Sequence, residues 1–176
     1  MDWDNFSDPY TCSVCGIKDA VPASGSRQSP ILVVGAYPGD DEVKKGKPMV
    51  GKMGGVFRTE LAYAGIDMSR LRLCNLWHHV PPPQDSETYE KCFQEGLRQV
   101  LDEAKDKKVI LLIGAETVKF FCDENVSDVN GLLVKSAYLS APTIFAMVQP
   151  AMVFHGGLGE VRLSIQKFSK IAGGLL

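Results

Sequence analysis

Four short apolar runs recur along the chain, and each leads into a segment rich in glycine, asparagine, histidine or proline. Most of their residues are aliphatic or β-branched, and three of the runs contain no charged residue. This pattern is typical of strands covered on both faces of a parallel sheet. It predicts four strands, at residues 31–34, 71–77, 109–113 and 141–148.

Helix-forming stretches separate these strands and follow the last one. They predict helices at residues 54–64, 88–105, 116–122 and 161–171, whereas the glycine-rich, charged residues 36–55 are predicted to be loop. Strands that alternate with helices indicate a three-layer α/β/α sandwich around a central, mainly parallel four-stranded sheet. A chain of 176 residues is expected to form a single domain, residues 1–176, with residues 1–30 as an N-terminal segment.

The carboxyl ends of the predicted strands are where a ligand is expected. In open α/β sheets, ligands bind outside these ends, which lie along one rim. The segments that leave the strands there are residues 35–39, 75–79, 114–117 and 149–151. We therefore expect the functional side chains to come from these four segments.

Composition narrows the classes of function. Hydrophobic residues make up 45% of the chain and charged residues 23%, which excludes disorder and coiled coil as the main structure. A net charge of -2 argues against a general polyanion-coating protein and limits any DNA contact to a local basic patch. No apolar run approaches the roughly 20 residues of a membrane span. The acidic N-terminus resembles neither a signal nor a transit peptide, so we expect a cytoplasmic or nucleoid-associated protein.

The first rim segment continues into a loop that combines glycines with charges. Its glycines would let a backbone approach a ligand closely, and amides at the start of the next helix would hold a phosphate. Positive charge gathers at Lys44, Lys45, Lys47, Lys52 and Arg58. The alternative is a solvated loop of mixed charge, because Asp40, Asp41 and Glu42 stand among these lysines.

The five cysteines fall into two kinds. Cys74 and Cys122 lie in apolar runs and are expected to be small core residues. Cys12 and Cys15 form a Cys-x-x-Cys in a polar segment. In a cytoplasmic protein such a pair favours metal or redox chemistry over a disulfide.

The rim segments carry four motifs in order. Residues 35–39 read Gly-Ala-Tyr-Pro-Gly, residues 46–54 read Gly-Lys-Pro-Met-Val-Gly-Lys-Met-Gly, Cys74 and Asn75 precede a His-His-Val-Pro-Pro tail, and residues 149–151 read Gln-Pro-Ala. Together they resemble the uracil-DNA glycosylase superfamily, most of all its family-four, iron–sulfur branch. The resemblance covers nearly the whole chain. It implies DNA binding, base flipping and hydrolysis of the N-glycosidic bond.

The chain departs from the catalytic motifs of that family at three positions. The acid that positions water falls on Ala36, the aromatic that stacks on the base falls on Met49, and the histidine that stabilises the leaving group falls on Gln149. Asn75, which would read a uracil edge, is retained. These departures leave open whether the chain is an active enzyme.

The resemblance and the loop chemistry together give two sets of candidate residues. Asp40 or Asp41 would replace the missing carboxylate, unless both simply face solvent, and Tyr37 would supply stacking. The candidate catalytic residues are Asp40, Asp41, Asn75 and Gln149. The candidate base- and DNA-binding residues are Gly35, Tyr37, Pro38, Gly39, Met49, Lys52, Asn75 and His155.

The resemblance also implies a 4Fe-4S cluster bound by four cysteines, but one of the four positions falls on a histidine. The expected ligands are Cys12, Cys15, His79 and Cys92. Three cysteines and one histidine are also a common structural zinc set, so zinc is the alternative cofactor. His78 or Cys74 would serve instead of His79, and a reduced Cys-x-x-Cys without metal remains a further alternative. A filled site would pin the N-terminal segment to the sheet.

Three functions follow from these patterns. The first is a DNA glycosylase that excises uracil or another modified pyrimidine. The second is a catalytically inactive relative that binds single- or double-stranded DNA as a replication or processivity accessory. The third is a protein-interaction scaffold, with replication or repair proteins as partners. The compact chain and its substitutions would suit a viral or phage protein.

Overall fold

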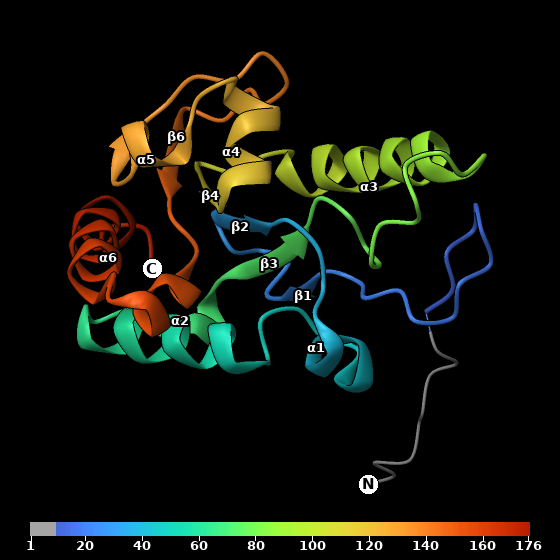
Figure 1. Ribbon diagram of the computed structural model, residues 1–176. Coiled ribbons are helices and arrows are strands. Elements are labelled where there is room, and N and C mark those ends of the chain that lie inside the picture. The colour runs from blue at the N-terminus through green and yellow to red at the C-terminus, as the bar shows by residue number, and fades with distance from the viewer. Residues whose placement is uncertain (1–9) are drawn as a thin grey trace, which may run out of the picture.

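The computed structural model describes residues 10–176, which form a six-stranded sheet between two layers of helices (Figure 1). The sheet has the order β1-β3-β2-β4-β6-β5. Its strands are β1 (Ser24–Gly25), β2 (Ile31–Gly35), β3 (Arg72–Asn75), β4 (Val109–Ile113), β5 (Leu132–Leu133) and β6 (Thr143–Met147). Residues 1–9, part of the predicted single domain and its N-terminal segment, lie outside the described residues.

The four central strands confirm the predicted parallel sheet. β2 pairs in parallel with both β3 and β4, and β4 pairs in parallel with β6. The two-residue strands β1 and β5 add antiparallel edges that the sequence did not predict. β3 ends at Asn75 rather than residue 77. The consecutive N–H groups of Leu76 and Trp77 donate to the consecutive carbonyl oxygens of Gly35 and Ala36, which departs from the alternating pattern of a parallel ladder.

The helices cover both faces of the sheet. The helical elements are α1 (Asp40–Lys45), α2 (Lys52–Tyr63), η1 (Met68–Arg70), α3 (Tyr89–Ala104), α4 (Ala115–Cys122), α5 (Val126–Val129), η2 (Pro150–His155) and α6 (Leu158–Ala172). Alternate residues of β2 divide the core: Ile31 and Val33 pack with α2 and α6, whereas Leu32 and Val34 pack with α3 and α4. This gives the predicted α/β/α sandwich, with α2 and α6 on one side and α3 and α4 on the other (Figure 1).

The segment predicted as loop at residues 36–55 contains a helix, so this part of the prediction was wrong. α1 begins after Gly39, carries three acidic residues in its first turn and two lysines in its last, and ends at Gly46 in a left-handed conformation. That charge order stabilises even a six-residue helix, because it complements the helix dipole. α2 also begins two residues earlier than predicted, at Lys52.

The N-terminal segment is described from Tyr10 onward. It makes a turn in which the Cys12 N–H donates to Ile17 O and the Gly16 N–H donates to Cys12 O. It then runs along the sheet edge, where the Val21 N–H donates to His78 O before β1 pairs with β3. In the described part of the chain, no helix is long and apolar enough to cross a membrane.

Candidate functional site

A cavity of about 490 Å³ opens at the carboxyl ends of the central strands, where the rim segments were expected to meet. Its walls come from the ends of β2, β3 and β4, from α1, from the start of α2 and from Gln149 after β6. Nine candidate residues line it: Gly35, Tyr37, Gly39, Asp40, Asp41, Met49, Lys52, Asn75 and Gln149. Pro38 is buried and His155 is exposed on η2, and neither lines the cavity.

Asn75 is the polar side chain at the inner wall. It lies opposite Gly35 in the parallel pair of β2 and β3, and a Cβ placed on Gly35 would stand 2.6 Å from Asn75 Oδ1. Within residues 10–176, the Asn75 side-chain amide makes no hydrogen bond. The half-buried amide therefore keeps one acceptor and one donor group for a ligand.

Met49 forms the floor beside Asn75. Its side chain is 2% exposed, belongs to the core between the sheet and α2, and reaches within 3.6 Å of the position of a Cβ on Gly35. Met49 adopts a φ of 56°, in the left-handed region, and a side chain at Gly54 would clash with its backbone. The tight turn before α2 therefore fixes this methionine in the position where the family resemblance expects an aromatic ring.

Glu42 organises the loop around the cavity, and sequence reasoning did not identify it as a site residue. Its buried carboxylate accepts the N–H groups of Gly39 at 3.1 Å, Val50 at 3.1 Å and Gly51 at 2.7 Å. These amides include the N-cap residues of α1 and α2, so the carboxylate occupies donors that the sequence analysis had offered to a phosphate. The available signal was the Gly-x-x-Glu spacing of a capping box at residues 39–42.

The outer rim of the cavity is exposed and carries both signs of charge. Asp40, Asp41 and Lys44 line it from α1, and Lys52 lines it from the start of α2. Asp41 Oδ2 lies 3.3 Å from the position of a Cβ on Gly51, so its carboxylate lies beside the start of α2. Both aspartates are exposed and both border the cavity, so they face solvent and the ligand space together.

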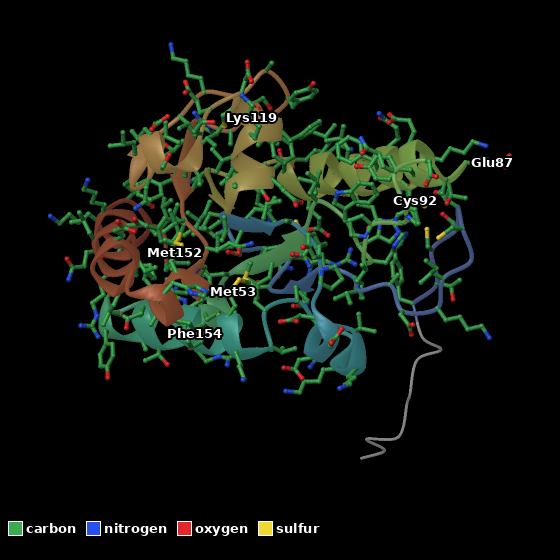
Figure 2. All side chains as sticks on the ribbon, viewed as in Figure 1. Met53, Glu87, Cys92, Lys119, Met152 and Phe154 are labelled. Atoms are coloured by element: carbon green, nitrogen blue, oxygen red, sulfur yellow. The ribbon has the colours of Figure 1, made fainter. Side chains whose placement is uncertain are left out.

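Gln149 lines the cavity from the segment after β6. It follows β6, and its side chain lies against Gly114 at the end of β4, where a Cβ would approach Gln149 Cγ to 2.9 Å. The next element, η2, exposes Met152 at 37% and Phe154 at 57%. Figure 2 shows both on the side of the molecule that carries Met53 at the start of α2. An exposed apolar pair therefore lies on the element that leads away from the cavity.

A second group of candidate residues lies away from the cavity. The ligand atoms of Cys12, Cys15, His79 and Cys92 all lie within 4.8 Å of one another. The Sγ atoms of Cys12 and Cys92 are 4.0 Å apart, and Cys15 Sγ lies 3.5 Å from His79 Nε2. The structure thus brings together the four expected ligands from the N-terminal turn, the segment after β3 and α3. Figure 2 shows Cys92 well away from Met152 and Phe154.

The orientation of His79 suits a metal ligand. Its Nδ1 lies 2.7 Å from Val80 O and must donate to it, because a carbonyl oxygen accepts only. In the neutral imidazole, Nε2 is then the unprotonated nitrogen, and it faces Cys15. In most metal-bound histidines, the ring nitrogen that does not bind the metal donates a hydrogen bond in this way, and that bond fixes the tautomer. The alternative ligands Cys74 and His78 do not belong to this group among the described residues.

The environment of these groups shifts their pKa values. Burial raises the pKa of Cys92 to about 12, and hydrogen bonds that its thiol donates to Cys15 and Cys12 add to the effect. For Cys12, burial raises the pKa, but N–H groups of Cys15 and Val14 outweigh it and leave the pKa below its ordinary value. The two sulfurs that face each other thus have pKa values shifted in opposite directions.

Two side chains next to this group are core residues. Trp77 is buried against Tyr89 and Phe93, as expected for a residue that packs into the core. His78 is buried, and neither of its ring nitrogens has a hydrogen-bond partner within the described chain. Burial, with a smaller contribution from His79, lowers the pKa of His78 to about 4, so its imidazole is neutral at pH 7.

The fold, the rim cavity and the four-ligand group together identify the class of protein. A family model for the uracil DNA glycosylase superfamily matches residues 22–168, and the chain belongs to this superfamily. The resemblance drawn from the four motifs is thereby confirmed.

Two curated relatives narrow the likeness to the family-four branch. The chain is 30% identical over 119 residues to the type-4 uracil-DNA glycosylase of Thermotoga maritima, and this stretch covers 64% of the chain and 61% of that relative. It is 33% identical over 103 residues to the type-4 uracil-DNA glycosylase of Archaeoglobus fulgidus, covering 57% of the chain and 51% of that relative. The matched part therefore spans less than two thirds of either relative.

Proposed function

We propose that the chain binds uracil-containing DNA and holds one pyrimidine, turned out of the base stack, in the cavity at Asn75. The free side-chain amide of Asn75 carries this proposal. An amide offers an acceptor and a donor side by side, which match the N3–H donor and a neighbouring carbonyl oxygen of uracil. Met49 and Tyr37 line the same cavity and would contact the faces of the base.

Contacts outside the cavity would hold the DNA strand. Lys44 and Lys52 are exposed at the rim and supply the positive charge that a phosphate needs. Met152 and Phe154 are exposed apolar side chains on η2, and side chains of this kind enter a base stack when a nucleotide is flipped. Gly39 would let the strand approach the loop closely, whereas Pro38 and His155 would contribute only from outside the cavity.

We further propose that excision of the base is slow. Hydrolysis of the N-glycosidic bond needs a positioned water and stabilisation of an anionic leaving group. Ala36 has no group for the first task, and Gln149 offers a neutral donor for the second. Asp41, with Asp40 beside it, is the carboxylate that would position water, and its exposure to solvent makes it a weak substitute.

Binding without excision is the second candidate, as a DNA-replication or repair accessory. One observation favours it: Ala36, Met49 and Gln149, the three departures from the family motifs, all line the same cavity. Either function would place the protein with DNA, in the cytoplasm or at the nucleoid.

A binding assay tests the proposal. Fluorescence anisotropy of labelled single- and double-stranded oligonucleotides, with one uracil or one thymine at the centre, is measured at about 50 mM salt. We expect about a tenfold loss of affinity for the uracil strand in Asn75→Ala, because a lost bidentate pair costs about 1–3 kcal/mol. Asn125→Ala, an exposed asparagine on the N-terminal side of α5, is the matched control. Equal affinity of wild type and Asn75→Ala for the uracil strand contradicts the proposal.

The same oligonucleotides separate slow excision from none. Alkali cleaves a strand wherever a base has been removed, so product that accumulates over hours with wild type and is absent with Asn75→Ala indicates a slow glycosylase. No product in the presence of specific binding favours the accessory function.

The metal group has a separate, structural role in the proposal. A cofactor held by Cys12, Cys15, His79 and Cys92 would join the N-terminal segment to the segment after β3 and to α3. The family-four resemblance favours a 4Fe-4S cluster there, with zinc as the alternative.

A further inference from the structure

The distances between the ligand atoms of this group are those expected around one tetrahedrally coordinated ion. With bonds of about 2.3 Å to sulfur and about 2.0 Å to nitrogen at tetrahedral angles, two sulfur ligands stand about 3.8 Å apart and a sulfur and a nitrogen about 3.5 Å apart. The Cys12 and Cys92 sulfurs are 4.0 Å apart, and the Cys15 sulfur is 3.5 Å from His79 Nε2. Both measured pairs therefore match the coordination shell of a single ion.

A 4Fe-4S cluster does not fit the same spacing. In a cubane, each of the four ligands binds a different iron, and the iron and sulfide atoms lie between the ligands. The ligand atoms then stand further apart than they do around one ion. Here all four lie within 4.8 Å of one another, which leaves room for one cation at their centre.

The donor set points the same way. Three thiolates and one imidazole are an ordinary ligand set for structural zinc, and an imidazole is an uncommon ligand for a cubane. His79 presents Nε2 to the group because Nδ1 donates to Val80 O. Cys12, His79 and Cys92 are each at most 1% exposed, whereas Cys15 is partly exposed. Four protein ligands would fill a tetrahedral shell, as in structural zinc sites, and leave no position for a substrate.

We propose that this centre holds one structural zinc ion, bound by Cys12, Cys15, His79 and Cys92, in place of an iron–sulfur cluster. The proposal concerns the centre alone and holds whether or not the cavity at Asn75 binds uracil. The ion would fasten the N-terminal turn to the segment after β3, which leads directly from Asn75.

Metal analysis decides between the two groups. The chain is expressed with both iron and zinc supplied and is purified without oxygen, and zinc, iron and acid-labile sulfide are measured together with the absorbance spectrum. We expect about one zinc per chain, no sulfide and a colourless protein. Iron and sulfide in roughly equal amounts, with brown colour, would overturn the proposal. A protein that contains neither metal nor sulfide would also overturn it.

Ligand variants assign the ion to the named side chains. Cys92→Ser and His79→Ala are expected to lose the zinc, whereas Cys122→Ser and His155→Ala, which change residues outside the group, keep it. Zinc retained in His79→Ala contradicts the proposed ligand set. If the ligand variants do not fold, Co²⁺ exchanged into the wild-type protein gives the same information. Visible absorption of tetrahedral cobalt with thiolate ligands supports the assignment, and octahedral cobalt without thiolate absorption contradicts it.

Discussion

Gly35 and Asn75 lie opposite each other at the ends of β2 and β3, so close that a Cβ on residue 35 would stand 2.6 Å from the Asn75 side-chain oxygen. Gly35 does not adopt a positive φ, so its backbone conformation does not require glycine. The position requires glycine because a side chain would occupy the space of the Asn75 amide. The absence of a side chain at Gly35 thus keeps room for the amide that would read the base.

The first prediction follows from that contact. Gly35→Ala should move the Asn75 amide and reduce affinity for uracil-containing DNA about as much as Asn75→Ala, roughly tenfold. The melting temperature should change little, because the displaced atom is the end of a half-buried side chain. Anisotropy and thermal unfolding measure the two effects. Gly55→Ala, at a position on α2 with open space, is the control, and wild-type affinity in Gly35→Ala would show that the contact does not matter.

The second prediction concerns Glu42, whose carboxylate holds the amides of Gly39, Val50 and Gly51. Glu42→Gln keeps the shape but loses the charge that strengthens these hydrogen bonds, so the free energy of unfolding should fall by about 1–3 kcal/mol. The start of α2 should loosen, and DNA affinity should fall with it. Urea unfolding and anisotropy test both. Asp40→Asn, an exposed residue of the same helix, should leave stability nearly unchanged; equal losses in the two variants would refute the special role of Glu42.

The sequence predicted the central strands from their apolar runs and the place of the cavity from the order of strands and helices. The run at residues 109–113 is apolar throughout and became β4 with the predicted bounds. The rim segments met because parallel strands share one carboxyl edge. Cys12 and Cys92 could be paired across 80 positions only through the family motifs, since spacing alone does not join them.

The elements that the sequence did not predict are short and are stabilised by local capping or by pairing with distant segments. α1 has no apolar periodicity, and its stability comes from the Glu42 cap and from its charge order. β1 and β5 have two residues each and exist only by pairing with β3 and β6. The order of residues in a loop also does not show which side chains face the cavity and which are buried. Pro38 was expected at the cavity, but it is buried and does not line it.

The third prediction links stability to pH through Arg72 and Glu103. Arg72, 4% exposed, donates from Nε and Nη2 to the Glu103 carboxylate at 2.7 and 2.6 Å. The hydrogen bond from Arg72 holds the pKa of Glu103 below its ordinary value of 4.5. The unfolded chain therefore binds this proton first, so the stability that the pair contributes is complete above about pH 4.5 and is lost as the pH falls through the folded-state pKa.

Glu103→Gln should lower the free energy of unfolding by about 2 kcal/mol at pH 7 and flatten its dependence on pH below about 4.5. Denaturant unfolding between pH 3 and pH 7 measures both changes. The neighbouring pair of Asp102 and Lys105 is exposed, and Asp102→Asn should leave stability nearly unchanged. A Glu103→Gln curve parallel to that of wild type across the acid range would mean that this pair does not contribute to the pH dependence.

The fourth prediction asks whether the cavity retains the geometry of an active glycosylase. Ala36→Glu with Gln149→His restores the carboxylate and the histidine of the family motifs, and positions 36 and 149 line the same cavity as Asn75. A carboxylate that positions water contributes about 10²–10⁴-fold in rate, and a donor to the developing anion about 10²–10³-fold. The double variant should therefore form abasic product from uracil-containing strands far faster than wild type. Alkaline cleavage of end-labelled oligonucleotides measures the rates.

Each single variant should give part of this gain, because the two groups act on different atoms of the reaction. Adding Asn75→Ala to the double variant should abolish the gained activity if the base is read by that amide. A double variant that binds uracil-containing DNA as wild type does, yet forms product no faster, would show that more than these two side chains separates the cavity from an active site. The remaining difference would then lie in Met49, whose flexible side chain stands where a rigid ring would hold the base.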